Sequence, residues 1–186
     1  QPYAAMNVGT GDGVTVRETR TCGPSDVVAS TIEVENVGSA PRRFQLIAWT
    51  AQPVTDETLE GAGVIDGVLH VRRVVSGLRN SSRSLTLALG MAGSRSFDMQ
   101  LSEATANHPH LHLTPYSETL AATGLSNEVT LTGVNRNGLL YAAIEGPLDV
   151  PVGGAVNVVV AASVALTTVD ALQHLAAGLD ADPVRD

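Results

Sequence analysis

Lysine is absent from this chain of 186 residues, and all eleven basic residues are arginine. Without lysine there is no phosphate-binding loop of the Walker type, because that loop reaches the phosphates with a lysine side chain. Cys22 is the only cysteine, which excludes an internal disulfide framework and any metal site built from several cysteines. The sequence also lacks a Gly-x-Ser-x-Gly elbow and a His-Glu-x-x-His helix, so none of these motifs names a reaction.

Aromatic residues are scarce and apolar runs are short. Phenylalanine, tryptophan and tyrosine together make up 3% of the chain, so valine, leucine and alanine must fill the core. The longest apolar run, AVNVVVAASVAL at 155–166, falls short of the roughly 20 residues that a membrane-spanning helix needs. Because this run is rich in β-branched residues, we expect a buried strand there and no membrane span. A chain of this length is most simply one domain over residues 1–186 with a single core.

The chain is acidic, with a formal net charge of −8, so strong general binding to nucleic acid is not expected. Arginines nevertheless gather in the middle of the sequence, at Arg42, Arg43, Arg72, Arg73, Arg79 and Arg83. They could form a local patch that contacts RNA or another anion. We favour the alternative that they are exposed strand and loop residues paired with nearby carboxylates, because few aromatic residues interleave with them.

Apolar and polar side chains alternate along most of the chain, which is typical of strands with one face on a core and one in water. The pattern covers residues 14–20, 30–36, 43–49, 68–74, 84–90, 96–102 and 128–133. Asp66-Gly67 and Asn137-Gly138 favour two-residue hairpins, and GTGDG at 9–13 predicts another turn. These features predict an all-β fold, an antiparallel β-sandwich or jelly roll of about 8–10 strands.

One short helix is expected near the end of the chain, over residues 168–178. Thr167 or Thr168 can cap its N-terminus, and Asp170 suits its first turn. Gly178 can end it. Residues 179–186 would then form a polar tail.

Three histidines stand at alternate positions in NHPHLHLTPYSE, residues 107–118, and a glutamate follows them. On a strand, His108, His110 and His112 would project from one face. Same-face neighbours about 6.6 Å apart can lean around one ion, since zinc binds imidazole nitrogen at about 2.0–2.1 Å. The cluster is therefore a candidate site for one divalent transition metal, with Glu118 as a further ligand. We favour the other interpretation, in which no cofactor is bound and the histidines face solvent or a neighbouring subunit.

The same segment resembles the first motif of cupins, in which a His-x-His pair is followed by a glutamate and then a glycine. The matching positions are His110, His112, Glu118 and Gly124. The stretch GPLDVPVGGAVN at 146–157 is similar to the second motif, but the last metal-binding histidine of that motif would fall near Val156 and Asn157. The resemblance implies a metal-dependent enzyme or metal-binding protein, whose metal would act as a Lewis acid or orient a substrate.

In its strand pattern and glycine-bearing loops, the sequence also resembles single jelly-roll virus coat proteins. This resemblance implies a structural subunit that assembles with itself, could contact other coat subunits, and belongs to a virion or an extracellular location. We favour this function because the catalytic motifs are missing. The cupin-like interpretation stays open as the alternative, and a secreted adhesion or carbohydrate-binding sandwich is a third.

Overall fold

The computed structural model describes residues 4–23, 26–54, 57–76, 81–93, 96–103, 125, 127, 129–130 and 138–180. These ranges hold eleven strands and one helix, which confirms the expected all-β class. The strands are β1 Ala4–Gly11, β2 Val14–Gly23, β3 Val27–Asn36, β4 Arg42–Val54, β5 Leu59–Ile65, β6 Val68–Ser76, β7 Ser82–Met91, β8 Ser96–Glu103, β9 Val129–Thr130, β10 Gly138–Val150 and β11 Ala155–Ala165. The helix, α2, spans Thr168–Asp180.

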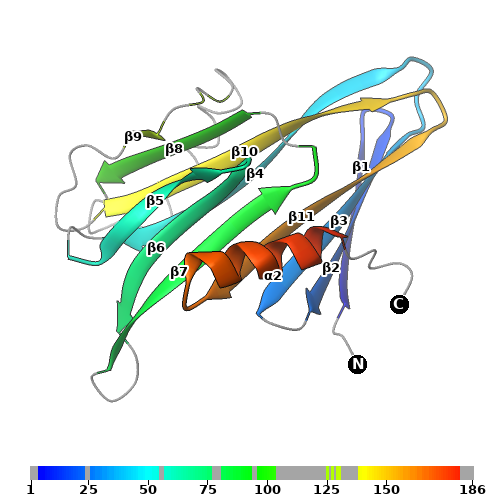
Figure 1. Cartoon of the computed structure of the whole chain (residues 1–186). Helices are drawn as coiled ribbons and strands as arrows, with labels where there is room; N and C mark the ends of the chain where they lie inside the picture. Colours follow the sequence, from blue (N-terminus) through cyan, green and yellow to red (C-terminus); the bar gives the residue numbers. More distant parts are fainter. Residues whose placement is uncertain are drawn as a thin grey trace.

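Two sheets stack face to face as a sandwich (Figure 1). One has seven strands in the order β1-β2-β3-β11-β7-β6-β5, and the other has four in the order β4-β10-β8-β9. Neighbouring strands are antiparallel, except that the short β9 runs parallel to β8. The antiparallel sandwich expected from the alternating pattern is therefore present.

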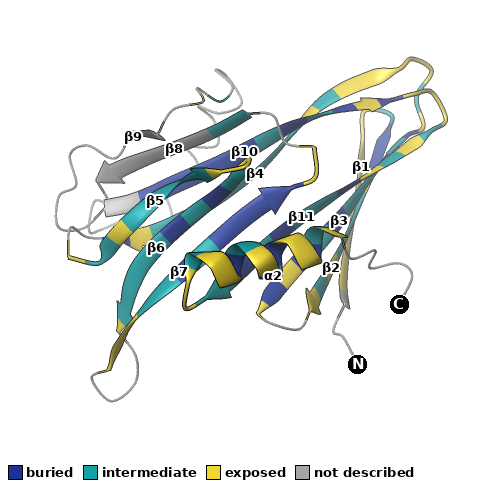
Figure 2. Ribbon diagram, in the orientation of Figure 1, coloured by how far each residue is buried: buried dark blue, intermediate teal, exposed yellow. Residues whose placement is uncertain are grey.

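The core between the sheets is largely aliphatic and is centred on β10. On the inner face of this strand, Leu140, Ala142 and Ile144 are completely buried. Alternate residues point to the opposite face, where Tyr141 is buried in a second cluster that includes Trp49. The middle of β10 is thus buried on both faces, as its dark blue colour in Figure 2 shows.

A long folded hairpin links the two sheets. β10 pairs with β4 in the four-stranded sheet, and after the turn at 151–154 the chain continues as β11, which pairs with β3 in the seven-stranded sheet. β3 itself continues into β4. Both arms of the hairpin therefore pass from one sheet to the other together, as the chain of a jelly roll does.

Only one of the two hairpins expected at two-residue turns is found. β5 and β6 pair across Asp66-Gly67, whose φ angles of 49° and 78° are the positive values that such a turn requires. The prediction of a hairpin at Asn137-Gly138 is wrong. Gly138 is the first residue of β10, where it pairs with β4 on one side and with β8 on the other. Neither edge of β10 is free at Gly138 for a hairpin partner.

The helix begins where the sequence predicts. The hydroxyl of Thr167 accepts a hydrogen bond from the backbone N–H of Asp170 at 3.1 Å, so Thr167 is the N-cap. α2 packs on the outer face of the seven-stranded sheet (Figure 1), where Leu175 lies against Gly90 of β7. An apolar stripe on α2 and small residues on the strands therefore hold the helix to the sheet.

Gly178 does not end the helix as expected, since α2 continues to Asp180. A Cβ atom on Gly178 would lie 2.5 Å from Cγ1 of Val27, closer than two non-bonded carbon atoms can approach. Glycine is needed here for close packing of the helix on β3. Of the expected polar tail, residues 179 and 180 belong to α2, and residues 181–186 lie outside the described ranges.

Asn36 joins the turns at one end of the sandwich. It is completely buried, and its side-chain amide donates to the carbonyl oxygens of Ala40 at 2.8 Å and Val150 at 3.2 Å. Its side-chain oxygen accepts a hydrogen bond from the N–H of Gly38 at 3.0 Å. Its backbone groups bond to the turn at 151–154. One polar side chain therefore connects both turns through which the chain changes sheets.

Replacing Asn36 by alanine should lower the free energy of unfolding by about 2–3 kcal/mol, because it leaves buried backbone groups such as the carbonyl of Val150 without a partner. Urea unfolding followed by circular dichroism measures this. Asn157→Ala is the control: Asn157 is exposed on β11, and its loss should cost less than about 0.5 kcal/mol. Equal costs for the two substitutions would contradict the structural role of Asn36.

Candidate functional site

The seven-stranded sheet extends beyond the four-stranded sheet, and the uncovered part is the candidate site. We call it the open margin and define it as β1, β2 and residues 27–31 of β3. Val16 and Val28 point to the same side of the sheet as the core, yet they are 39% and 40% exposed. In Figure 1 these strands lie on the side of the molecule away from β8 and β9.

A two-residue turn positions β1. Asp12 and Gly13 have φ angles of 49° and 74°, as a type I′ hairpin requires, and β1 pairs with β2 along its whole length without a slip in register. The N–H of Val37 donates to the carbonyl oxygen of Gly13 at 2.9 Å, and the guanidinium of Arg42 donates to that of Asp12 at 3.1 Å. Of the turn expected at 9–13, residues 12–13 form the turn, which is anchored to the rest of the sandwich, whereas residues 9–11 belong to β1.

β1 forms one edge of the seven-stranded sheet and carries no charged residue. Its sequence is AAMNVGTG, in which Met6 is 69% exposed and Val8 is 61% exposed. The other edge, β5, carries Glu60 and has a break in register between Leu59 and Gly61. A charge and a bulge both discourage a further strand from pairing with an edge. β5 is thus protected in two ways that β1 is not.

The outer face of the open margin places an ion-pair cluster beside these apolar side chains. Arg17, which lies opposite Val8, forms ion pairs with Glu33 and with Glu35, the latter at 2.9 Å. Hydrogen bonds to Glu33 and then to Glu35 raise the pKa of Arg17. The cluster beside the exposed edge therefore holds one positive and two negative charges, a net charge of −1.

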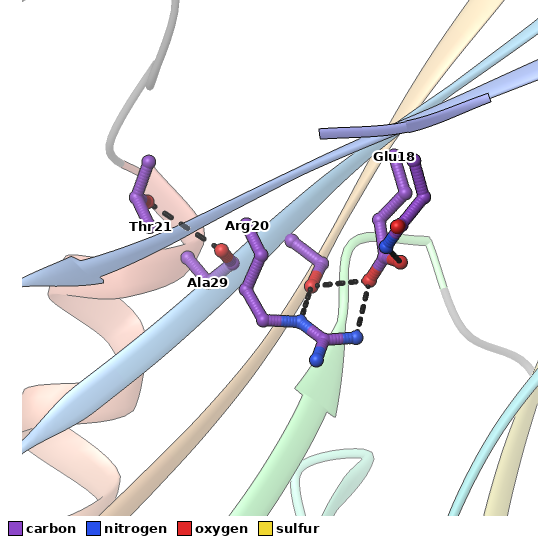
Figure 3. A network of polar contacts seen from close by, with 6 residues as sticks. Glu18, Arg20, Thr21 and Ala29 are labelled. Atoms are coloured by element: carbon purple, nitrogen blue, oxygen red, sulfur yellow. Dashed lines mark hydrogen bonds and ion pairs between the residues drawn. The ribbon is translucent and has the colours of Figure 1, made fainter. Parts of the chain in front are cut away.

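The inner face of the open margin carries a polar network that joins its three strands (Figure 3). The carboxylate of Glu18 accepts hydrogen bonds from Arg20 at 2.7 Å, from Ser30 at 2.9 Å and from Asn7 at 3.1 Å. The bond from Arg20 is the main cause of a lowered pKa of Glu18, and partial burial opposes it. This network fixes the side chains of β1, β2 and β3 relative to one another.

Two open clefts flank Arg42 at the start of β4. The larger, of about 510 Å³, is lined by Gly9, Thr10, Gly11, Asp12, Val14, Val16, Arg42 and Phe44. The smaller, of about 440 Å³, is lined by Pro41, Arg42, Arg43, Asp149, Val150 and Pro151, and Arg43 pairs with Asp149 there at 2.6 Å. Open grooves of this kind suit contact with another surface more than enclosure of a substrate, since small-molecule sites bury most of their ligand.

The arginines singled out in the sequence stand at two separate places. Arg42 and Arg43 are at the start of β4, whereas Arg73 donates to the carbonyl oxygen of Pro53 near the end of that strand. A strand of 13 residues extends roughly 40 Å, so the two groups cannot act on one small anion.

Two of these arginines are paired with carboxylates, as the favoured interpretation of them as exposed strand and loop residues expects. Arg43 pairs with Asp149, and Arg72 pairs with Glu60 at 2.9 Å. Arg83 is exposed near the start of β7, and Arg79 lies outside the described residues. Contact of any of these arginines with RNA or another anion stays a prediction.

The proposed metal ligands lie in a segment outside the described residues: His108, His110, His112 and Glu118. The second cupin-like stretch is described, and there Val156 faces the core while Asn157 is exposed on the outer face. Within the described ranges, no three or more histidine, cysteine, aspartate or glutamate side chains gather so that they could hold a metal ion. No helix in the described part of the chain is long and apolar enough to span a membrane.

The sequence patterns missed β1, which forms the exposed edge. The available signal was the dipeptide Asp12-Gly13, which is as typical of a tight hairpin as Asp66-Gly67 is. A hairpin requires a strand on both sides of its turn, and the residues before Asp12 are its first arm.

Outside the open margin, His70 is a titratable residue whose pKa is changed by burial. It lies on β6 beside Gly63 of β5, and its Nδ1 atom is buried without a hydrogen-bond partner among the described residues. Burial lowers the pKa of His70, because the charged imidazolium loses its hydration.

This shift predicts that His70 makes the folded chain less stable in mild acid. As the pH falls below about 6.5, the unfolded chain takes up a proton at this residue before the folded chain does, so the free energy of unfolding falls. Urea unfolding at pH 7.5 and 5.5 should show a smaller fall for His70→Gln than for the unsubstituted chain. The same fall in both would contradict the buried, neutral state of His70.

No protein-family model matches the chain, and a search among curated proteins finds no match.

Proposed function

We propose that this protein is a structural subunit that assembles with copies of itself, as virus coat and surface proteins do. The observation that supports this is the edge strand β1, which is uncharged and carries the exposed side chains of Met6 and Val8. On the inner face of the open margin, Val16 and Val28 add further exposed apolar side chains.

An exposed strand edge presents backbone N–H and C=O groups that can pair with another chain. Folded proteins commonly block such an edge with a charge, a proline or a bulge, and β5 has a charge at Glu60 and a break in register. β1 has none of these between Ala4 and Gly11. The contrast between two edges of one sheet supports a role for β1 in contact with another chain.

Self-association of an acidic chain must overcome repulsion, since each copy has a net charge of −8. The open margin is suited to this. Its edge strand is uncharged, and the nearby carboxylates Glu18, Glu33 and Glu35 are all paired with arginine. Two copies that meet at this edge bring few unbalanced negative charges together.

Size-exclusion chromatography with light scattering, followed by negative-stain microscopy, tests the proposal. We expect the purified chain to form species larger than one copy. Val8→Lys should shift the mass toward that of a single chain. A lysine on an edge strand discourages pairing with another strand, because its charge would be brought into the contact.

Val169→Lys is the matched control. Val169 is on α2 and is 63% exposed, close to the value for Val8, but it is not on a strand edge. This variant should assemble like the unsubstituted chain, and circular dichroism should show both variants folded. A single-chain mass at every concentration, or equal effects of the two lysines, would contradict the proposal.

A further inference from the structure

We infer that the partner of β1 is β1 of a second copy, paired antiparallel about a two-fold axis at Asn7, with Met6 opposite Val8 of the other copy. This rests on the proposed function and adds the occupant of the edge, its direction and its register. Three independent constraints lead to it.

The first constraint is the direction of the backbone groups of β1. In an antiparallel pair, alternate residues turn their N–H and C=O groups toward the partner strand. The two-residue turn makes Gly11 and Val14 the first bonded pair of the β1–β2 hairpin, so Gly9 and Asn7 also bond to β2. The intervening residues, Met6 and Val8 among them, turn these groups away from β2. Their backbone groups are the ones available to a further strand.

The second constraint comes from symmetry. Two copies of one strand pair antiparallel about a two-fold axis perpendicular to the sheet, which keeps each face of the sheet on the same side. Residues opposite each other must therefore project from the same face. Met6 and Val8 are two positions apart and share the outer face, so either can stand opposite the other. Asn7, between them, can stand only opposite residues of the inner face, which include Asn7 itself.

The third constraint selects the register. Placing Asn7 at the axis puts Met6 opposite Val8 twice, once on each side, and pairs Ala4 with Thr10. The two most exposed apolar side chains of the strand then cover each other. A shift that puts Val8 at the axis would instead place Met6 opposite Thr10, with less apolar contact. The register at Asn7 also brings the available backbone groups of Met6 and Val8 into bonded positions.

No charged side chain stands opposite another in this arrangement, because β1 has none. Within each copy, the neighbouring strand β2 places Thr19 beside Met6 and Arg17 beside Val8. Arg17 is already paired with Glu33 and Glu35, and this cluster brings a net charge of only −1 per copy near the contact. The paired edges would join two seven-stranded sheets into one continuous sheet.

Disulfide cross-linking of the full chain tests the register. Cys22, the one native cysteine, is exposed and is first replaced by serine. In that background, Asn7→Cys should form a covalent dimer under mild oxidation, seen on a non-reducing gel. Residues facing each other at a non-bonded antiparallel position have Cα atoms about 4.5 Å apart, which is within the range that a disulfide spans.

Ala4→Cys in the same background is the matched control on the same strand. In the inferred register its two copies lie six residues apart, about 20 Å, so it should stay uncross-linked. A second test mixes Met6→Cys and Val8→Cys chains, which should cross-link to each other more than either does alone. This test does not depend on the fold of the Asn7 variant.

The outcomes separate this inference from the function on which it rests. If the chain assembles but Val8→Cys alone cross-links best, or Asn7→Cys and Ala4→Cys cross-link equally, the register is wrong and the proposed function stands. If the chain assembles and no cysteine on β1 cross-links, another surface makes the contact and the inference fails. A single-chain mass at every concentration overturns both.

Discussion

The contact between the inner face of β10 and the seven-stranded sheet holds the two layers together. Leu140, Ala142 and Ile144 are completely buried in this contact, and β10 approaches β3, β11, β7 and β6 at the centre of the wider sheet. The free energy gained by burying aliphatic side chains is roughly proportional to the area removed from water. The narrower sheet is therefore most stable where it covers the centre of the wider sheet. A four-stranded layer that sits there leaves the strands beyond β3 uncovered. The open margin is therefore a consequence of the same packing that stabilises the core.

Polar side chains solve a problem that this mismatch creates. Strands without a facing sheet cannot rely on apolar packing on both sides, and the margin uses cross-strand polar contacts instead. The network around Glu18 and the cluster around Arg17 join neighbouring strands on opposite faces. In these contacts the charged side chains of the open margin are paired with one another or with neighbouring residues of β3. What is left for another molecule is the backbone edge of β1 and the apolar side chains beside it.

Tertiary contacts overrode local sequence signals at two glycines and one strand. Gly178 has the chemistry of a helix end, but close packing against Val27 decided its use. Gly138 has the chemistry of a turn, but β10 needed its position because both neighbouring strands pair there. The alternation in 4–11 is weakened by two glycines, which have low strand propensity, so the side-chain pattern does not show β1 and only the turn at Asp12-Gly13 points to it.

The sequence by itself determined the class of the fold, the faces of most strands, the hairpin at Asp66-Gly67 and a threonine cap for α2 at Thr167 or Thr168. These features depend on residues within a few positions of one another, where side-chain alternation, turn geometry and capping act directly. Only the tertiary structure decided which strands became edges and how far one sheet extends beyond the other. Those outcomes depend on contacts between distant residues, such as the pairing of β4 with β10 and the packing of the inner face of β10 on the wider sheet. No local pattern encodes such a contact, because its free energy appears only when both strands have been placed.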